Sequence, residues 1–189
     1  MGVLKKLLFT ASGLMVLVII SSFFMPQQYT VERSIIIDAE TSDVYPYVVN
    51  LKQWEKWGVW FKRDPNMELS YAGPDRAIGM RLEWKSDTEG DGEMEIIQLE
   101  HNSKVSYTLY FPEMDMGSSG VVEIEATDNG SRVTWRDEGT VDNNPINKLF
   151  VLFIDDMIGP DFAMGLENLK TVVENNAQPK RIITGSLNN

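Results

Sequence analysis

The chain has 189 residues, 43% of them hydrophobic, which is enough for one domain with a substantial core and one further segment. It has no cysteine and a single histidine, His101, which excludes disulfides, thiolate metal sites and catalytic sites built from several histidines. The formal net charge of −11 makes nucleic acid a poor partner, because the phosphate backbone is itself polyanionic.

The first predicted element is an apolar run from Leu7 to Met25. As a helix, its 19 residues would extend about 28 Å, close to the thickness of a bilayer's hydrocarbon core. Lys5 and Lys6 precede it, and this flanking charge predicts a cytoplasmic N-terminus with the remaining chain outside the cytoplasm, periplasmic in a Gram-negative cell. We therefore expect residues 1–26 to form a single-pass membrane anchor. A cleaved signal peptide and a buried core helix are the alternatives.

The middle of the chain carries strand and turn patterns. Residues 29–38 are rich in β-branched side chains and predict a strand. Two short helices follow, the first of them amphipathic over residues 44–51. Residues 67–141 then alternate short strands with turns, and residues 128–130 (Asp-Asn-Gly) are the strongest hairpin signal. Connections of hairpin length predict an antiparallel sheet.

Residues 143–176 have the longest helical pattern of the predicted domain. A stripe of apolar residues has the spacing of one helix face: Phe162, Leu166, Leu169 and Val173. We expect this helix to begin or kink sharply at Gly159 and Pro160, because proline lacks the backbone donor. Residues 146–158 are apolar on almost every side, which predicts burial or contact with a ligand or a membrane.

The predicted order is one strand, two short helices, six strands and a long helix. An α+β fold, in which a curved antiparallel sheet of about seven strands grips the C-terminal helix, accommodates this order without long crossovers. Such a sheet can hold a cavity between its concave face and the helix. We therefore assign residues 27–176 to one domain and residues 177–189 to a flexible polar tail.

Three stretches resemble the START-like helix-grip superfamily: Trp54-x-x-Trp57-x-x-Trp60, residues 130–135 (GSRVTW) and residues 157–170. The likeness covers about residues 29–175 and is greatest to bacterial membrane-anchored members of the SRPBCC or polyketide cyclase-like group. It implies the helix-grip fold with an internal cavity. Because the superfamily shares a cavity rather than one chemistry, the resemblance supports the fold far more than a function.

Large side chains are the candidates for the wall of an apolar ligand cavity. We expect these to line it: Trp57, Trp60, Trp84, Tyr107, Phe111, Trp135, Met157 and Phe162. An ordinary packed core is the alternative for each. Asp137 is the one candidate catalytic or anchoring residue, since it shares strand parity with Val133 and Trp135, and a buried carboxyl would have a raised pKa. The alternative that we favour is a strand-end side chain turned toward solvent.

No nucleophile–base pair, phosphate-binding loop or metal-ligand spacing occurs in the sequence, so we expect neither a cofactor nor a metal. We expect His101 to lie in a surface turn. Residues 155–156, both aspartate, are expected to be solvated, and Arg81 and Glu83 to form an exposed pair.

The leading interpretation is a membrane-tethered, non-catalytic domain that binds a hydrophobic small molecule or lipid in an apolar cavity. A second is a cyclase or hydratase that uses a carboxylate such as Asp137 with a tyrosine. A third is an interaction domain without a pocket, which docks a partner or a bilayer through residues 146–158. Nucleic acid is not expected as a partner in any of them.

Overall fold

The computed structural model describes residues 2–22 and 24–177. Its elements are α1 (Gly2–Ser22), β1 (Gln28–Ile37), α2 (Thr41–Val49), the 3-10 helix η1 (Leu51–Lys56), α3 (Val59–Arg63), β2 (Glu68–Ala72), β3 (Arg81–Lys85), β4 (Gly92–Glu100), β5 (Lys104–Phe111), β6 (Met116–Thr127), β7 (Gly130–Thr140), α4 (Pro145–Val151) and α5 (Ile154–Asn176). In this part of the chain, seven strands form one antiparallel sheet in the order β1-β7-β6-β5-β4-β3-β2. The predicted α+β helix-grip fold is confirmed.

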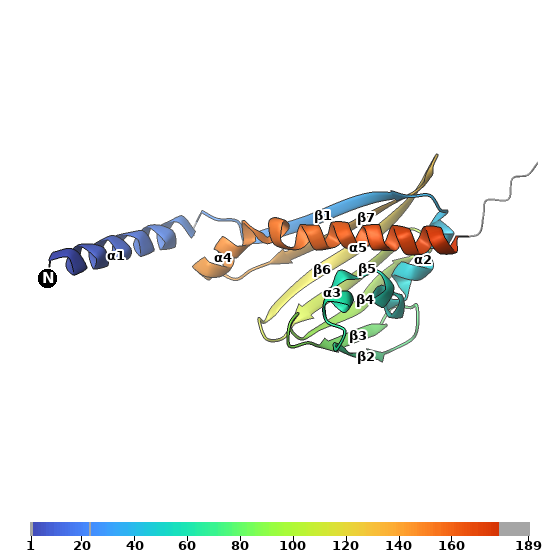
Figure 1. The fold of residues 1–189 in the computed structure, drawn as a ribbon, viewed down its shortest axis with the longest axis horizontal. Coiled ribbons are helices and arrows are strands. Elements are labelled where there is room, and N and C mark those ends of the chain that lie inside the picture. Colours follow the sequence, from blue (N-terminus) through green and yellow to red (C-terminus); the bar gives the residue numbers. More distant parts are fainter. Residues whose placement is uncertain (1, 23, 178–189) are drawn as a thin grey trace, which may run out of the picture.

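The helix α5 lies along β1, and α2, η1 and α3 complete the layer on the same side of the sheet (Figure 1). The predicted apolar stripe faces the sheet: Leu166, Leu169 and Val173 are at most 1% exposed. Burial of one such side chain stabilises the fold by roughly 1.5–3 kcal/mol. The core therefore lies between the concave face of the sheet and these helices.

The helix α5 begins earlier than the sequence predicts. It starts at Ile154 and runs through Pro160, so of the start or sharp kink expected at residues 159–160, the start is wrong. The carbonyl that Pro160 leaves without a helical donor is that of Asp156, an exposed residue, so water can satisfy it. The break in the helical segment lies instead between α4 and α5, at Leu152 and Phe153.

The helix α1 covers most of the run predicted as an anchor, and it contacts α4. Among the helices of the described residues, none has the combined length and hydropathy required to cross a membrane. The anchor over residues 1–26 therefore stays a prediction. The tail predicted from residue 177 onward lies almost entirely outside the described residues.

Candidate functional site

An aromatic layer fills the space between α5 and the sheet; we use this name for Trp54, Trp57, Trp60, Tyr107, Trp135 and Phe162. Trp135 on β7 lies at its centre, with its ring stacked on that of Phe162 at a centroid distance of 4.1 Å. Trp54, Trp57 and Trp60 meet the Trp135 ring edge-to-face at 5.5, 5.2 and 5.8 Å. Aromatic pairs prefer such stacked and edge-to-face arrangements over a flat sandwich, so the layer is a well-packed one.

The indole nitrogens of Trp54, Trp57 and Trp135 each donate a hydrogen bond. Trp54 Nε1 donates to the carbonyl of Val48 at 2.8 Å, and Trp135 Nε1 donates to the Tyr107 hydroxyl at 2.7 Å. Trp54, Trp57 and Trp135 are at most 1% exposed. The centre of the layer therefore has the properties of a core, whereas Trp60 at its rim is half-buried.

The eight residues predicted to line a cavity divide into three groups. The structure brings together five of them in the aromatic layer: Trp57, Trp60, Tyr107, Trp135 and Phe162. Trp84 and Phe111 form a separate pair at 5.9 Å, toward the β2–β3 end of the sheet. Met157 lies on the outer side of α5 and is 52% exposed, so it does not join either group.

Asp137 lies two residues after Trp135 on β7 and is only 2% exposed, so the expectation that it turns to solvent is wrong. The strand alternation continues through this position, where Asp137 pairs with Val31 on one side and Gly120 on the other. Ser118 Oγ donates to Asp137 Oδ2 at 3.0 Å. Burial raises the pKa of Asp137 from 3.8 to about 6, although the hydrogen bond from Ser118 opposes the shift.

The negative charge of Asp137 affects the pKa of two tyrosine phenols. Burial and, second, that negative charge raise the pKa of Tyr29 to about 12. The same two causes raise the pKa of the fully buried Tyr107 well above its usual value. Both phenols therefore keep their protons at neutral pH. We call Tyr29, Tyr107, Ser118 and Asp137 the polar cluster.

Glycines in the strands make room for the two phenols. A Cβ on Gly120 would lie 1.9 Å from Cζ of Tyr107, and one on Gly139 would lie 2.3 Å from the hydroxyl of Tyr29. Gly120 lies in β6 and Gly139 in β7, and each is a glycine at a position where a tyrosine ring occupies the space of a side chain.

Within the described residues, no lysine or arginine forms an ion pair with Asp137, and its pKa is influenced mainly by burial. A carboxyl group that titrates near pH 6 can accept a proton at neutral pH and donate one in mild acid. The same group can also anchor a hydroxyl or an amine of a ligand. The described residues contain no group of three or more side chains suited to hold a metal ion.

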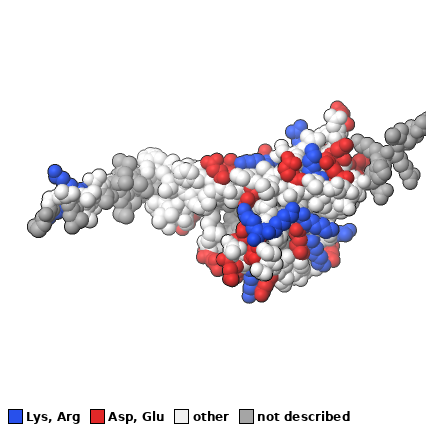
Figure 2. All heavy atoms as spheres, viewed as in Figure 1, with Lys and Arg blue, Asp and Glu red and all other residues white. Residues whose placement is uncertain are grey.

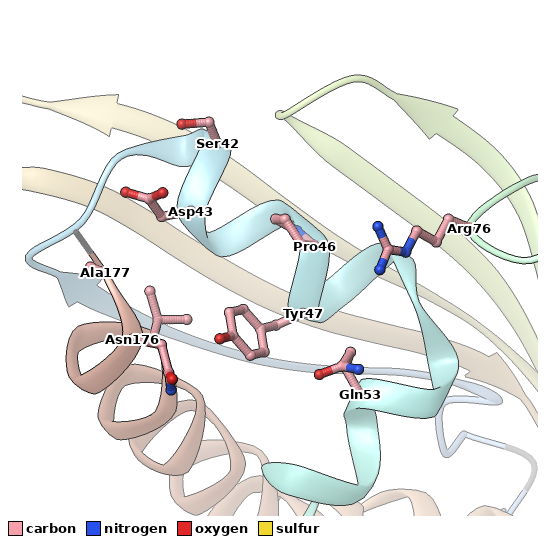
Figure 3. Close-up of a pocket in the computed structure, with 9 residues that line it drawn as sticks. Ser42, Asp43, Pro46, Tyr47, Gln53, Arg76, Asn176 and Ala177 are labelled. Atoms are coloured by element: carbon pink, nitrogen blue, oxygen red, sulfur yellow. The ribbon is translucent and has the colours of Figure 1, made fainter.

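Two surface pockets lie outside the aromatic layer. One of about 320 Å³ lies between α2, η1 and the end of α5, and the side chains that line it include Asp43, Tyr47, Gln53 and Arg76 (Figure 3). A second, of about 360 Å³, lies at the β2–β3 end of the sheet and includes Trp84. None of the other seven predicted lining residues contributes to either pocket.

The remaining predicted positions are on the surface. His101 is exposed in a turn, as expected, with its ring 5.5 Å from that of Tyr45. Arg81 does not pair with Glu83 but with Glu95 of the neighbouring strand β4, because the register places Arg81 opposite Glu95.

Asp155 is exposed but not simply solvated. Its carboxylate accepts two hydrogen bonds from the Arg33 guanidinium, at 2.8 and 3.1 Å. The Arg33 side chain passes under Gly159, where a Cβ would lie 1.9 Å from Nη2. Arg33 thus ties β1 to the first turns of α5.

Sequence reasoning missed Tyr29 and Ser118. The hairpin at residues 128–130 carried a usable signal, because continuing its pairing along both strands places Gly120 opposite Asp137 and Ser118 opposite Gly139. Side chains two positions apart on neighbouring strands lie within reach of each other, which brings Ser118 to Asp137.

Comparison with solved structures supports the fold. A protein of unknown function from Staphylococcus aureus matches with a TM-score of 0.61 and 14% identity, covering 78% of this chain and 94% of that one. The di-domain aromatase/cyclase StfQ of the steffimycin biosynthetic pathway matches with a TM-score of 0.61 and 16% identity, covering 79% of this chain and 52% of that one. Norcoclaurine synthase from Thalictrum flavum, in complex with dopamine and hydroxybenzaldehyde, matches with a TM-score of 0.58 and 13% identity, covering 80% and 90%.

Identities this low show a shared fold alone and carry no information about chemistry. Among curated protein sequences, none matches the chain significantly. A family model described as "Polyketide cyclase / dehydrase and lipid transport" matches residues 28–174, which span the chain from β1 to the last turn of α5. The chain therefore belongs to the polyketide cyclase/dehydrase and lipid transport family.

Proposed function

We propose that the concave face of the sheet binds a hydrophobic small molecule or lipid that carries a hydroxyl or an amine. The polar group of the ligand would meet Asp137, and its apolar part would lie along the aromatic layer. One observation carries the proposal: Asp137 is buried among apolar and aromatic side chains with a serine hydroxyl as its donor and no cationic partner in the described residues.

The energetics of burial favour this assignment over a purely structural role. Burial of a carboxylate without a cation is unfavourable, as the raised pKa of Asp137 reflects. An apolar side chain of similar size would stabilise the core without that loss. A ligand that donates a hydrogen bond to Asp137 would recover part of the lost interaction, and perturbed carboxyls of this kind are typical of functional sites.

The family and two of its structural neighbours are consistent with this ligand class. The family description includes lipid transport. The norcoclaurine synthase structure contains two small aromatic molecules, dopamine and hydroxybenzaldehyde, and StfQ comes from a polyketide pathway. These are properties of those proteins, and they support a hydrophobic, polar-ended ligand for this chain by analogy of fold.

A matched pair of fluorescent probes tests the proposal. Both carry the same alkyl chain, which ends in a primary alcohol in one and in a methyl group in the other. We expect the wild-type chain to prefer the alcohol by about tenfold, because a hydrogen bond to a charged group contributes roughly 1.5–3 kcal/mol. The preference should fall markedly in Asp137→Asn, because the neutral amide oxygen is a weaker acceptor than a carboxylate.

Glu138→Gln is the control, since Glu138 is exposed on the opposite side of the same strand. It should bind both probes as the wild type does. Equal affinity of the wild type for the alcohol and the methyl probe would rule out Asp137 as the anchor. Binding of neither probe would rule out the site.

The raised pKa of Asp137 also favours a second candidate, an enzyme of the cyclase or hydratase type. A carboxylate with a pKa of about 6 next to two protonated phenols could take a proton from a substrate, while Tyr29 donates a hydrogen bond to the developing oxyanion. Turnover of a candidate substrate that is lost in Asp137→Asn, with retained probe binding, would favour the enzyme. Turnover that persists in Asp137→Asn would exclude this mechanism.

A membrane tether is the remaining part of the proposal. It rests on the uncharged run over residues 7–31 and on the two lysines that precede it. A reporter fused after Asn189 should be active only on the outer side of the membrane. Deletion of residues 1–25 should release a folded domain from the membrane fraction, and a reporter active in the cytoplasm would overturn the orientation.

A further inference from the structure

The segment that joins α4 to α5 exposes an apolar face. We call residues 145–157 the elbow. Its exposed large hydrophobic side chains have exposed fractions between 39% and 74%: Ile146, Leu149, Phe150, Leu152, Phe153 and Met157. Val151 and Ile154, on the other side of the same segment, are buried. The elbow is therefore amphipathic, with a large apolar surface turned away from the domain.

This apolar surface continues toward α1. The helices α1 and α4 are in contact, and α1 leaves the domain beside the elbow (Figure 1). Exposed hydrophobic residues of α1 include Leu7, Leu8 and Phe9. In Figure 2 the surface around α4 is mostly white, and the charged side chains lie over the rest of the domain from the start of α5 onward. Most of the large exposed hydrophobic residues in the described chain lie in α1 or the elbow.

The nature of this surface favours lipid over protein as its partner. A protein interface of this size normally includes a polar rim and about one hydrogen bond per 100–200 Å². From residue 146 to residue 153 the exposed side chains of the elbow are aliphatic and aromatic, and its one lysine, Lys148, is 95% buried. The interior of a bilayer requires such a face, because it cannot satisfy polar groups. The exposed carboxylates of the elbow, Asp155 and Asp156, are confined to the first turn of α5, where Asp155 pairs with Arg33. They would lie at the polar headgroup boundary.

We propose that the elbow inserts into the apolar boundary of a lipid bilayer, beside α1. Such insertion requires no bound ligand and is independent of the binding site proposed above. It has one consequence for that site: β7 ends only a few residues before α4, so Asp137 and the elbow lie at the same end of the sheet. The polar cluster would therefore lie close to the membrane surface.

The absence of cysteine from the sequence allows a direct test with the full chain. Single variants Phe153→Cys, Phe150→Cys and Met164→Cys are labelled with the same environment-sensitive fluorophore and reconstituted into phosphatidylcholine vesicles that contain nitroxide-labelled acyl chains. Met164 is the matched control, because it is 61% exposed on α5 outside the elbow. Since an apolar helix face lies about 5–10 Å into the headgroup boundary, we expect at least about twofold more quenching at residues 150 and 153 than at residue 164.

Two elbow positions are labelled so that the test does not depend on the folding of a single variant. Circular dichroism of each labelled chain checks that the sheet has formed. Equal quenching at residues 150, 153 and 164 would overturn the proposal. Shielding of the elbow labels from aqueous iodide without lipid quenching would overturn it in favour of a protein partner or a second copy. A label at Phe9→Cys reports α1 separately, so that loss of the tether and loss of the elbow contact give different patterns.

Discussion

Both parts of the C-terminal helical segment are rich in apolar side chains, but they face different surroundings. In α5, Phe162, Leu166 and Leu169 are at most 4% exposed and lie against the sheet and the aromatic layer. In the elbow, Phe150, Phe153 and comparable residues are about half exposed and point away from the domain. The comparison shows that helical periodicity establishes an apolar face, whereas only the tertiary structure decides what covers that face.

The largest expected effect comes from the buried side of this comparison. Phe162→Ala should lower the free energy of unfolding by about 3–5 kcal/mol, because it removes a ring stacked on Trp135 and leaves a cavity. Urea denaturation of the full chain in detergent measures it. Met164→Ala, at an exposed position of the same helix, should change stability by less than about 0.5 kcal/mol. A small effect of Phe162→Ala would show that the aromatic layer is loosely packed.

The next effect concerns Asp137 and pH. Its folded-state pKa is raised to about 6, so between pH 4 and pH 6 the folded state binds the proton more strongly than the unfolded state. Stability should therefore fall as the pH rises through this window, by up to about 3 kcal/mol for a shift of about two pKa units. Asp137→Asn should lose this fall and be the more stable protein at pH 7, whereas Glu138→Gln should keep it. Identical pH profiles of the wild type and Asp137→Asn would contradict the burial of the carboxyl.

A smaller effect is expected where β1 meets the beginning of α5. Asp155→Asn weakens the paired hydrogen bonds with Arg33. The side chains of Arg33 and Asp155 are both partly exposed. Exposed ion pairs contribute roughly 0.2–1 kcal/mol, so the loss should lie in that range and decrease with added salt. Thermal unfolding at low and high salt measures this difference. A loss above about 2 kcal/mol that does not depend on salt is the size expected for a buried ion pair. Such a loss would show that Arg33 is desolvated.

The smallest effect belongs to the outward face. Met157→Gln keeps helix propensity and side-chain length, and the position is 52% exposed, so stability should change by less than about 0.5 kcal/mol. Binding of the alcohol probe should also be unchanged, because Met157 lies outside the aromatic layer and the polar cluster. Loss of probe binding in this variant would restore Met157 to the ligand site predicted from the sequence.

The fold could be predicted from the sequence because its signals are local. The stripe at Leu166 and Leu169, the hairpin at residues 128–130 and the three tryptophans spaced by three residues each identify an element or a face. The start of α5 could not be predicted from Pro160, because a proline within a helix is tolerated where the orphaned carbonyl reaches water.

The site was predictable only in part. Five of eight lining candidates meet in one layer because they come from elements that pack together, but the sequence does not show that Met157 lies on the outer side of the same helix. The alternation along the strand indicated that Asp137 shares a face with Val133 and Trp135. It did not indicate how far along β7 this face of the sheet remains covered. Tyr29 and Ser118 required the strand register, which parity within one strand does not provide.

Native mass spectrometry of the full chain, extracted from its own cells in mild detergent, tests the central proposal most directly. We expect the wild-type protein to retain a hydrophobic small molecule or lipid that carries a hydroxyl or an amine, and Asp137→Asn to retain markedly less of it. Glu138→Gln should retain as much as the wild type. A wild-type protein that is folded but carries no such molecule, or one that is carried equally by Asp137→Asn, would contradict the assignment of the polar cluster as a ligand anchor.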